Sequence, residues 1–251
     1  MITNIPKIIH QIWIQGYDKI PEHLKLYHKS CLDINSDFEH IFWDDVKIIN
    51  FLSTVYNENY VNTYKNYKKL AQKADFARYA ILYKYGGIYL DMDMLCRKNL
   101  SSFLSYNLFC TVDILSIIST RYLNGTIGTK PNHPLFMYVF KNIFKRLPKS
   151  SNVTYSTGTI LFYDSVKEYK KTTGKSDISI IDRKYLHPCQ PYDDDDCGSK
   201  CKDCYVSHMN NGSWKSGIHK YAEKNCMKIL KWLVLIILII VFYIFIINKQ
   251  Y

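Results

Sequence analysis

Short runs of apolar residues recur along the chain and predict strands. Residues 7–13 (KIIHQIW), bounded by Pro6 and Gly16, are typical of a buried strand. Residues 38–42 (FEHIF) alternate between apolar and polar positions, which is the pattern of a half-exposed strand. Further runs predict strands at 88–90, 109–112 and 178–181.

Between these runs, apolar positions three and four residues apart predict helices. The strongest pattern covers 64–85, and Gly86-Gly87 should end it because glycine readily adopts the left-handed conformation at a helix C-terminus. Asp44 or Asp45 can cap a helix that carries Val46, Ile49 and Leu52. Helices are also expected at 135–147 and 158–170. Strands alternating with helices predict one α/β domain with a mostly parallel central sheet over residues 1–225.

The C-terminal segment has a different pattern. From Trp232 to Ile247 every residue is apolar or aromatic, and the run extends to 229–247 with Lys231 as its one interruption. About 19 helical residues just span a hydrocarbon core of roughly 30 Å, because the long lysine side chain can reach the interface. We therefore expect a transmembrane helix at 229–247 and a short tail at 248–251. The alternative is a buried core helix.

The lysines around this segment are unevenly distributed. Lys249 follows the uninterrupted apolar run at 232–247, whereas five lysines precede that run: Lys215, Lys220, Lys224, Lys228 and Lys231. The positive-inside bias then predicts a single-pass protein with a C-terminal anchor and a cytosolic N-terminal domain, in a host or virion membrane. The N-terminus has no long apolar run, so no secretory signal is expected.

Composition and charge narrow the class of protein. The 251 residues are 47% hydrophobic and carry a formal net charge of +11, with no Lys/Arg run of the kind that binds nucleic acid. No nucleic-acid partner is expected. The positive balance is compatible with nucleotide phosphates or acidic lipid surfaces, and also with an ordinary solvated, lysine-rich surface.

The eight cysteines include a cluster near the end of the predicted domain. Its members are Cys189, Cys197, Cys201 and Cys204, with His208 downstream. The spacing allows a zinc site, disulfides or free thiols, and cytosolic exposure would keep the thiols reduced.

Two aspartates follow the predicted strand at 88–90. In an extended chain Asp91 and Asp93 point to the same side, with Met92 facing the core. Two carboxylates this close repel each other unless a cation lies between them. Mg²⁺ and Mn²⁺ prefer such oxygen ligands and complete their shells with phosphate oxygens. The C-terminal ends of strands in open α/β sheets are also common ligand sites.

Asp75 and Arg78 lie three residues apart on one face of the long predicted helix. They could form a surface ion pair of at most about 0.5 kcal/mol. The surrounding segment (ADFARYAILY) is apolar, however, and buried charges are costly unless well paired. We therefore favour a functional role for this pair.

The segment 74–93 (ADFARYAILYKYGGIYLDMD) resembles the DXD-containing sugar-binding region of a glycosyltransferase family. That family includes the yeast initiating α-1,6-mannosyltransferase and bacterial capsule enzymes, and the segment is also similar to the core of the clostridial glucosylating toxins. Other segments resemble further blocks of the family: 5–13 (IPKIIHQIW), 42–45 (FWDD), 124–134 (NGTIGTKPNHP), 156–158 (STG) and 208–214 (HMNNGSW).

The resemblance implies a GT-A fold, a nucleotide-sugar donor as co-substrate, a divalent metal (Mn²⁺ or Mg²⁺) and retention of anomeric configuration. By the same resemblance, Asp91 and Asp93 engage metal, diphosphate and ribose, and Asp75 and Arg78 contact the donor sugar. Trp13 matches the aromatic position near the nucleobase, although it could be a core strand residue.

The last block of the resemblance adds three residues. His208 matches a metal or diphosphate contact, and Ser213 and Trp214 match residues that close over the donor phosphates. An ordinary loop histidine, a zinc ligand of the cysteine cluster, or a packing tryptophan are the alternatives. Thr159 stands where the family commonly has proline, so the acceptor-side loop is expected to differ.

The sequence thus predicts a membrane-anchored, metal-dependent glycosyltransferase. It would move a hexose from a UDP- or GDP-sugar to a glycan, lipid or protein acceptor. A non-catalytic binding module and a nucleotide-sugar hydrolase are the alternatives. The intact set Asp75, Arg78, Asp91 and Asp93 favours the transferase.

Overall fold

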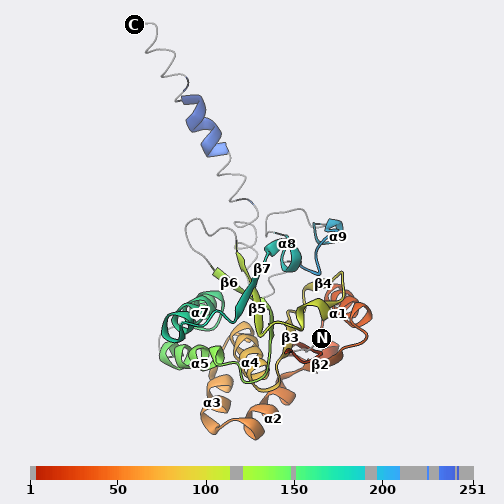
Figure 1. The fold of residues 1–251 in the computed structure, drawn as a ribbon, viewed down its shortest axis with the longest axis vertical. Helices are drawn as coiled ribbons and strands as arrows, with labels where there is room; N and C mark the ends of the chain where they lie inside the picture. Colours follow the sequence, from red (N-terminus) through yellow and green to blue (C-terminus); the bar gives the residue numbers. More distant parts are fainter. Residues whose placement is uncertain are drawn as a thin grey trace.

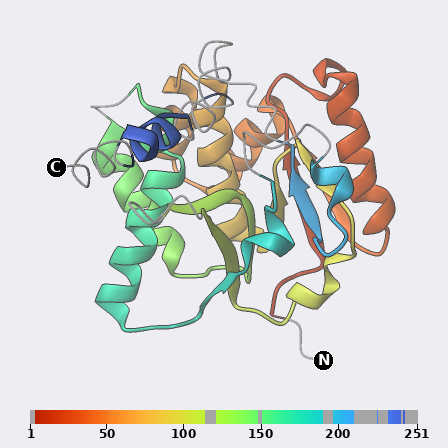
Figure 2. The ribbon, with the colours of Figure 1, turned by 90° about the horizontal axis from the view of Figure 1, so that it is seen from above.

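A six-stranded sheet lies between two layers of helices (Figures 1 and 2). The structure, a computed structural model, describes residues 4–113, 121–147, 151–189, 197–209, 225, 232–240 and 242. The sheet order is β2-β1-β3-β6-β5-β7, and β4 pairs with β8 in a separate two-stranded sheet. The strands are β1 (Ile8–Ile12), β2 (Glu39–Trp43), β3 (Gly87–Leu90), β4 (Met94–Cys96), β5 (Leu108–Asp113), β6 (Arg121–Thr129), β7 (Ile178–Ile181) and β8 (Val206–His208).

The main sheet is mixed: five of its six strands run in one direction, which agrees with the predicted mostly parallel sheet, and β6 runs against them, which the sequence did not predict. β1 is parallel to both β2 and β3, and β5 is parallel to β7, but β6 runs antiparallel to both β3 and β5. Only residues 114–120 separate β5 from β6, too few for the crossover that parallel strands require. The sequence of β6 (RYLNGTIGT) also hides the strand, because its Asn and Gly residues are typical of turns.

Most of the predicted helices are confirmed, but one of them is two separate helices in the structure. The stretch 64–85 is not one helix: α3 ends at Asn66 and α4 begins at Leu70, because Tyr67 and Lys69 adopt extended backbone conformations. Asp44 caps α2 by accepting a hydrogen bond from the backbone N–H of Lys47 at 2.8 Å. The longer helices are α1 (Glu22–Ile34), α2 (Asp45–Val55), α3 (Glu58–Asn66), α4 (Leu70–Tyr85), α5 (Leu135–Arg146) and α7 (Thr159–Thr173), and the short ones are α6 (Val153–Ser156), α8 (Arg183–Leu186) and α9 (Cys197–Lys200).

The sheet separates two hydrophobic cores. One lies between the sheet and α2, α3, α4, α5 and α7, and the other lies on the face covered by α1, α8 and the small β4–β8 sheet. Figure 2 shows α1 on the opposite side of the sheet from α5 and α7. Nine of the residues of helix α4 are buried, and they include Asp75 and Arg78. These two charged side chains are therefore held within the packed interior of the domain.

The predicted transmembrane helix is wrong. Among the described residues, no helix is both long enough and apolar enough to cross a bilayer. Of 229–247, the structure describes 232–240 and 242. The remaining positions of the predicted span lie outside the described residues. The single-pass membrane localisation that rested on this helix is corrected with it.

The cysteine cluster forms disulfides. Cys189 pairs with Cys197, and Cys201 with Cys204. A third disulfide, not foreseen from the sequence, joins Cys31 of α1 to Cys96 of β4. This pairing differs from the reduced state expected for cytosolic exposure, because disulfides persist mainly in oxidising compartments.

Candidate active site

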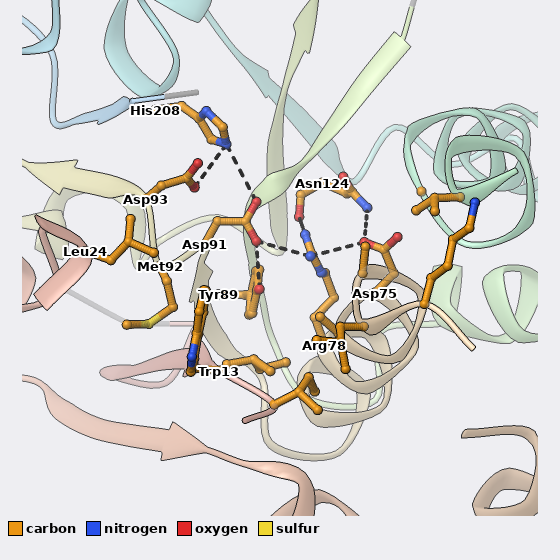
Figure 3. A pocket seen from close by; sticks show the side chains of 18 of the residues that line it. Trp13, Leu24, Asp75, Arg78, Tyr89, Asp91, Met92, Asp93, Asn124 and His208 are labelled. Atoms are coloured by element: carbon orange, nitrogen blue, oxygen red, sulfur yellow. Dashed lines mark hydrogen bonds and ion pairs between the residues drawn. The ribbon is translucent and has the colours of Figure 1, made fainter. Parts of the chain in front are cut away.

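One cavity of about 600 Å³ opens over the C-terminal ends of β1 and β3. Its walls come from segments far apart in the sequence: the chain after β1, helix α4, the turn after β3, the start of β6, the segment around α6 and β8. Figure 3 shows that its polar side chains form a row, with Asp93 and His208 at one end and Asp75 at the other.

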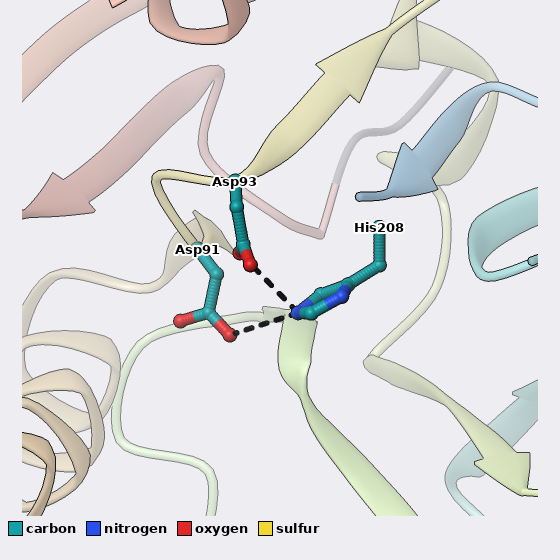
Figure 4. Close-up of side chains that lie close together, drawn as sticks. All are labelled: Asp91, Asp93 and His208. Atoms are coloured by element: carbon teal, nitrogen blue, oxygen red, sulfur yellow. Dashed lines mark ion pairs between the residues drawn. The ribbon is translucent and has the colours of Figure 1, made fainter. Parts of the chain in front are cut away.

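Asp91, Asp93 and His208 converge at one end of this row (Figure 4). The His208 Nε2 atom lies 3.3 Å from Asp93 Oδ1 and 3.8 Å from Asp91 Oδ2. Backbone pairing brings the histidine there, because Met94 opposes His208 across β4 and β8 and the Met209 N–H donates to the Asp93 carbonyl at 2.9 Å. The sequence prediction that these three residues share a site agrees with this placement.

The donor set is suited to a divalent cation. One oxygen or nitrogen from each of Asp91, Asp93 and His208 lies within 4.8 Å of the others. Carboxylate oxygens suit Mg²⁺ and Mn²⁺, and an imidazole nitrogen is a softer donor that shifts the preference toward Mn²⁺. Met92 lies between the two aspartates in the sequence. It packs on Ile20 and Leu24, which agrees with its predicted inward orientation.

Arg78 links the two ends of the row. Its Nη2 lies 3.1 Å from both Asp75 Oδ1 and Asp91 Oδ1, and its Nη1 donates to the Asn124 carbonyl at 2.6 Å. The guanidinium also covers the ring of Tyr89, with its carbon 4.4 Å from the ring centroid. Within the described part of the chain, the buried Nε atom of Arg78 has no hydrogen-bond partner. A buried donor without a partner costs about 1–3 kcal/mol.

Asp75 is a buried carboxylate, and its neighbours favour its ionised form. Burial raises its pKa to about 6, and the charge of Arg78 and hydrogen bonds from Thr157 and Asn124 oppose that rise. The Thr157 hydroxyl donates to Oδ2 and the Asn124 amide to Oδ1, both at 2.9 Å. The carboxylate is therefore fixed in orientation and titrates close to neutral pH.

The electrostatics at Asp91 differ. Burial opposes ionisation there too, but Arg78, His208 and the hydroxyl of Tyr89 outweigh it and lower the pKa of Asp91. The carboxylate lies directly against β6, where a Cβ at Gly125 would be 2.7 Å from Asp91 Oδ2. A side chain at that position would force the Asp91 carboxylate to move.

Trp13 lies at the other side of the cavity, beyond the end of β1. It is half-buried, packs beside Leu24 and Met92, and its indole N–H donates to the Lys19 carbonyl at 3.2 Å. It lines the cavity and is not a fully buried core residue. Ser213 and Trp214 lie outside the described residues.

Sequence reasoning did not single out four residues of this site: Tyr89, Asn124, Gly125 and Thr157. Asn124 and Gly125 belong to the segment NGTIGT, where a polar residue next to glycine within a buried strand was an available signal. Thr157 lies in the segment 156–158, but its contact with Asp75 spans 82 residues and is invisible in the sequence.

The fold and the site together define an α/β glycosyltransferase of GT-A type. Residues 21–110 match the model of the glycosyltransferase sugar-binding region containing the DXD motif. An uncharacterized glycosyltransferase of Acanthamoeba polyphaga mimivirus is 57% identical over 210 residues, which cover 84% of each chain. The chain therefore belongs to the DXD-motif glycosyltransferase family.

More distant similarities agree with this assignment. Inositol phosphoceramide mannosyltransferase 3 of Schizosaccharomyces pombe is 37% identical over 160 residues, which is 62% of this chain and 43% of that protein. The chain thus spans less than half the length of this relative. The solved structure of the PaToxG glycosyltransferase shares the fold, with a TM-score of 0.53 at 20% identity over 66% of this chain and 70% of that one.

Proposed function

We propose that this glycosyltransferase is metal-dependent and transfers a hexose from a nucleotide-sugar, with mannose from GDP-mannose as the first donor to test. The observation that carries this proposal is the convergence of Asp91 and Asp93, from the turn after β3, with His208 of β8. Mannose is chosen because the S. pombe relative is named as a mannosyltransferase. Retention of anomeric configuration is part of the proposal and follows from the family resemblance alone.

The donor fits along the row of polar side chains. In this proposal Trp13 lies by the nucleobase, Asp91 and Asp93 by the ribose and diphosphate, and Asp75 and Arg78 by the sugar. Arg78 lines the cavity, so in this proposal its guanidinium donates to the ligand in a site of low dielectric. Ser213 and Trp214 remain predicted contacts to the donor phosphates.

The residues of the site have different roles in the proposed transfer. Asp75, held by Thr157 and Asn124, accepts hydrogen bonds from sugar hydroxyls and fixes the sugar's orientation. Arg78 donates to the donor and keeps Asp75 and Asp91 from repelling each other. A divalent ion held by Asp91, Asp93 and His208 would supply positive charge where the leaving diphosphate becomes more negative.

The test uses the purified full chain with GDP-mannose and UDP-glucose, with Mn²⁺ or with EDTA. We expect Mn²⁺-dependent release of nucleotide diphosphate that EDTA abolishes. Asp93→Asn should lower turnover at least about tenfold, which is about 1.4 kcal/mol of barrier, because the cation loses one charged ligand. Circular dichroism and the melting temperature should stay near the wild-type values.

Asp33→Asn is the matched control, because Asp33 is an exposed carboxylate on α1 that pairs with Lys29 outside the cavity. It should leave turnover unchanged. If folded Asp93→Asn protein kept more than about a tenth of wild-type activity at saturating Mn²⁺, the metal assignment would be wrong. Proton NMR of a product formed on an added acceptor reports the anomeric configuration and separates transfer from hydrolysis.

A further inference from the structure

The orientation of the His208 ring decides whether this residue can bind a cation. Strand β8 ends at His208, and pairing with Met94 of β4 fixes its backbone. The torsion that turns an imidazole ring about its Cβ–Cγ bond is broad and roughly two-fold, so backbone pairing alone does not determine which ring atom faces the cavity. In the structure Nε2 is the atom nearest Asp93, at 3.3 Å from Oδ1. This orientation therefore depends on contacts that the ring itself makes.

The ring of His187 makes such a contact. The two imidazole rings are stacked, with their centroids 4.8 Å apart and their planes inclined by 22°. This separation lies within the range in which offset stacking of aromatic rings is favourable. His187 is buried and does not line the cavity. It therefore lies outside the proposed donor contacts and reaches the metal site through the ring of His208.

Arg183 in turn fixes His187. This arginine is the first residue of α8 and is itself buried. Its Nε donates to the His187 carbonyl at 2.7 Å, and its Nη2 donates to the Cys189 carbonyl at 2.8 Å. The same Nη2 lies 3.3 Å from Nδ1 of His187, and because arginine can only donate, Nδ1 is the acceptor. One edge of the His187 ring is thus held by Arg183 while its face contacts His208.

The segment between β7 and β8 brings the two histidines together. Helix α8 follows β7 directly, and Asp182 caps it by accepting a hydrogen bond from the Lys184 N–H at 3.0 Å. The Tyr205 N–H donates to the Tyr185 carbonyl at 2.8 Å, which joins α8 to the chain just before β8. The stacked rings therefore lie between two elements whose backbones are hydrogen-bonded to each other.

We propose that His187 is a positioning residue of the metal site, whose ring holds the imidazole of His208 with Nε2 toward Asp91 and Asp93. This inference rests on the proposed metal-dependent function and adds to it a residue that touches neither the cation nor the donor. Removing a group that orients a metal ligand typically lowers metal affinity by about 10–100-fold. Without the stack, the His208 ring would turn away from the carboxylates for part of the time, and the cation would be bound less tightly.

Three substitutions separate the ring of His187 from its hydrogen bond. His187→Phe keeps a flat ring for the stack and loses the acceptor for Arg183, His187→Asn keeps a side-chain acceptor and loses the ring, and His187→Ala loses both. Mn²⁺ binding to the full chain is measured by electron paramagnetic resonance, and the melting temperature of each variant is recorded.

We expect His187→Ala and His187→Asn to bind Mn²⁺ about tenfold more weakly than wild-type protein, and His187→Phe to stay within about threefold of it. A purely structural role predicts a different order, because Mn²⁺ affinity would then follow the melting temperatures. That result would overturn the proposal.

NMR of the metal-free protein tests the hold on the ring independently of the metal. The ring C–H signals of His208 are identified by their loss in His208→Ala, and ¹³C relaxation reports how freely the ring moves. Ring mobility should rise in His187→Ala and His187→Asn and should stay near the wild-type value in His187→Phe.

His23→Ala is the matched control, because His23 is an exposed histidine of α1 that does not line the cavity. It should change neither Mn²⁺ affinity nor the mobility of the His208 ring. Unchanged Mn²⁺ affinity in folded His187→Ala protein, or an unchanged ring mobility, would overturn the positioning role. If wild-type protein bound no Mn²⁺ while His187→Ala released the ring, the proposed metal dependence would be wrong and the hold of His187 on His208 would stand.

Discussion

At the scale of single residues, the most unusual feature is the pKa of the buried Asp75 carboxyl group. The carboxylate is buried, yet three donors converge on it: the guanidinium of Arg78, the amide of Asn124 and the hydroxyl of Thr157. Its pKa of about 6 is the balance between burial and these donors. A carboxylate poised in this way makes activity sensitive to pH within the physiological range.

Thr157→Val tests this balance with a nearly isosteric change. Loss of the hydroxyl removes a donor to the charged form, so the pKa of Asp75 should rise above its present value of about 6. A hydrogen bond to a charged group contributes about 1.5 kcal/mol, which is about one pKa unit. If the ionised carboxylate binds the sugar, the acid limb of the kcat/KM profile should move about one unit to higher pH.

Thr157→Ser is the companion variant, because serine keeps the hydroxyl. Its pH profile should remain close to that of the wild-type enzyme. A valine variant with an unshifted acid limb and normal folding would show that Thr157 does not act through Asp75.

At the scale of elements, the connection between α4 and β3 positions both ends of the site. Gly86 ends the helix that carries Asp75 and Arg78, and Gly87 begins the strand that leads to Asp91. Both glycines have positive φ, 66° and 86°. At Gly87 a Cβ would lie 2.8 Å from the Ile8 carbonyl oxygen, so the glycine also allows β1 and β3 to pair closely.

Gly87→Ala should therefore be severely destabilising. Left-handed strain costs about 1–2 kcal/mol and overpacking adds about 1–3 kcal/mol, so we expect a loss of about 3 kcal/mol. The measurement is the free energy of unfolding from urea titration. Gly174→Ala is the control, because Gly174 has φ of 65° but open space around its Cβ, and it should lose only the strain. Equal losses in the two variants would mean that the strand contact does not matter.

At the scale of the whole molecule, the disulfides connect the small β4–β8 sheet to the rest of the domain. The Cys31–Cys96 bond joins α1 to β4, which follows the two aspartates, and spans 65 residues. The Cys189–Cys197 bond spans only 8 residues and lies in the segment that leads to β8 and His208. Their contributions to stability should differ, because a longer closed loop restricts the unfolded chain more strongly.

The double variant Cys31→Ser/Cys96→Ser should lose about 4 kcal/mol of unfolding free energy under non-reducing conditions, and Cys189→Ser/Cys197→Ser about 2.5 kcal/mol. Urea titrations of both proteins check the ranking. A larger loss from the short loop would show that native packing, and not loop closure, determines the effect.

Added Mn²⁺ should raise the unfolding free energy of the wild-type protein if His208 and the aspartates bind it.

Much of this protein could be predicted from local sequence patterns. The apolar positions three and four residues apart in α4, the apolar runs of β1, β3 and β7, and the Asp44 cap of α2 depend on neighbours a few residues away. The paired aspartates and the Asp75–Arg78 spacing were visible for the same reason. The family followed from these residues, because they lie within one continuous segment.

The tertiary structure decided what depends on residues distant in the sequence. The direction of β6, the approach of His208 to Asp93, the hold of Thr157 on Asp75 and the Cys31–Cys96 bond each join segments whose meeting is set by packing. The predicted span at 229–247 is not among these features, because the described residues contain no helix that could cross a membrane. Local chemistry thus determined which groups the site could use, and long-range packing determined which of them meet.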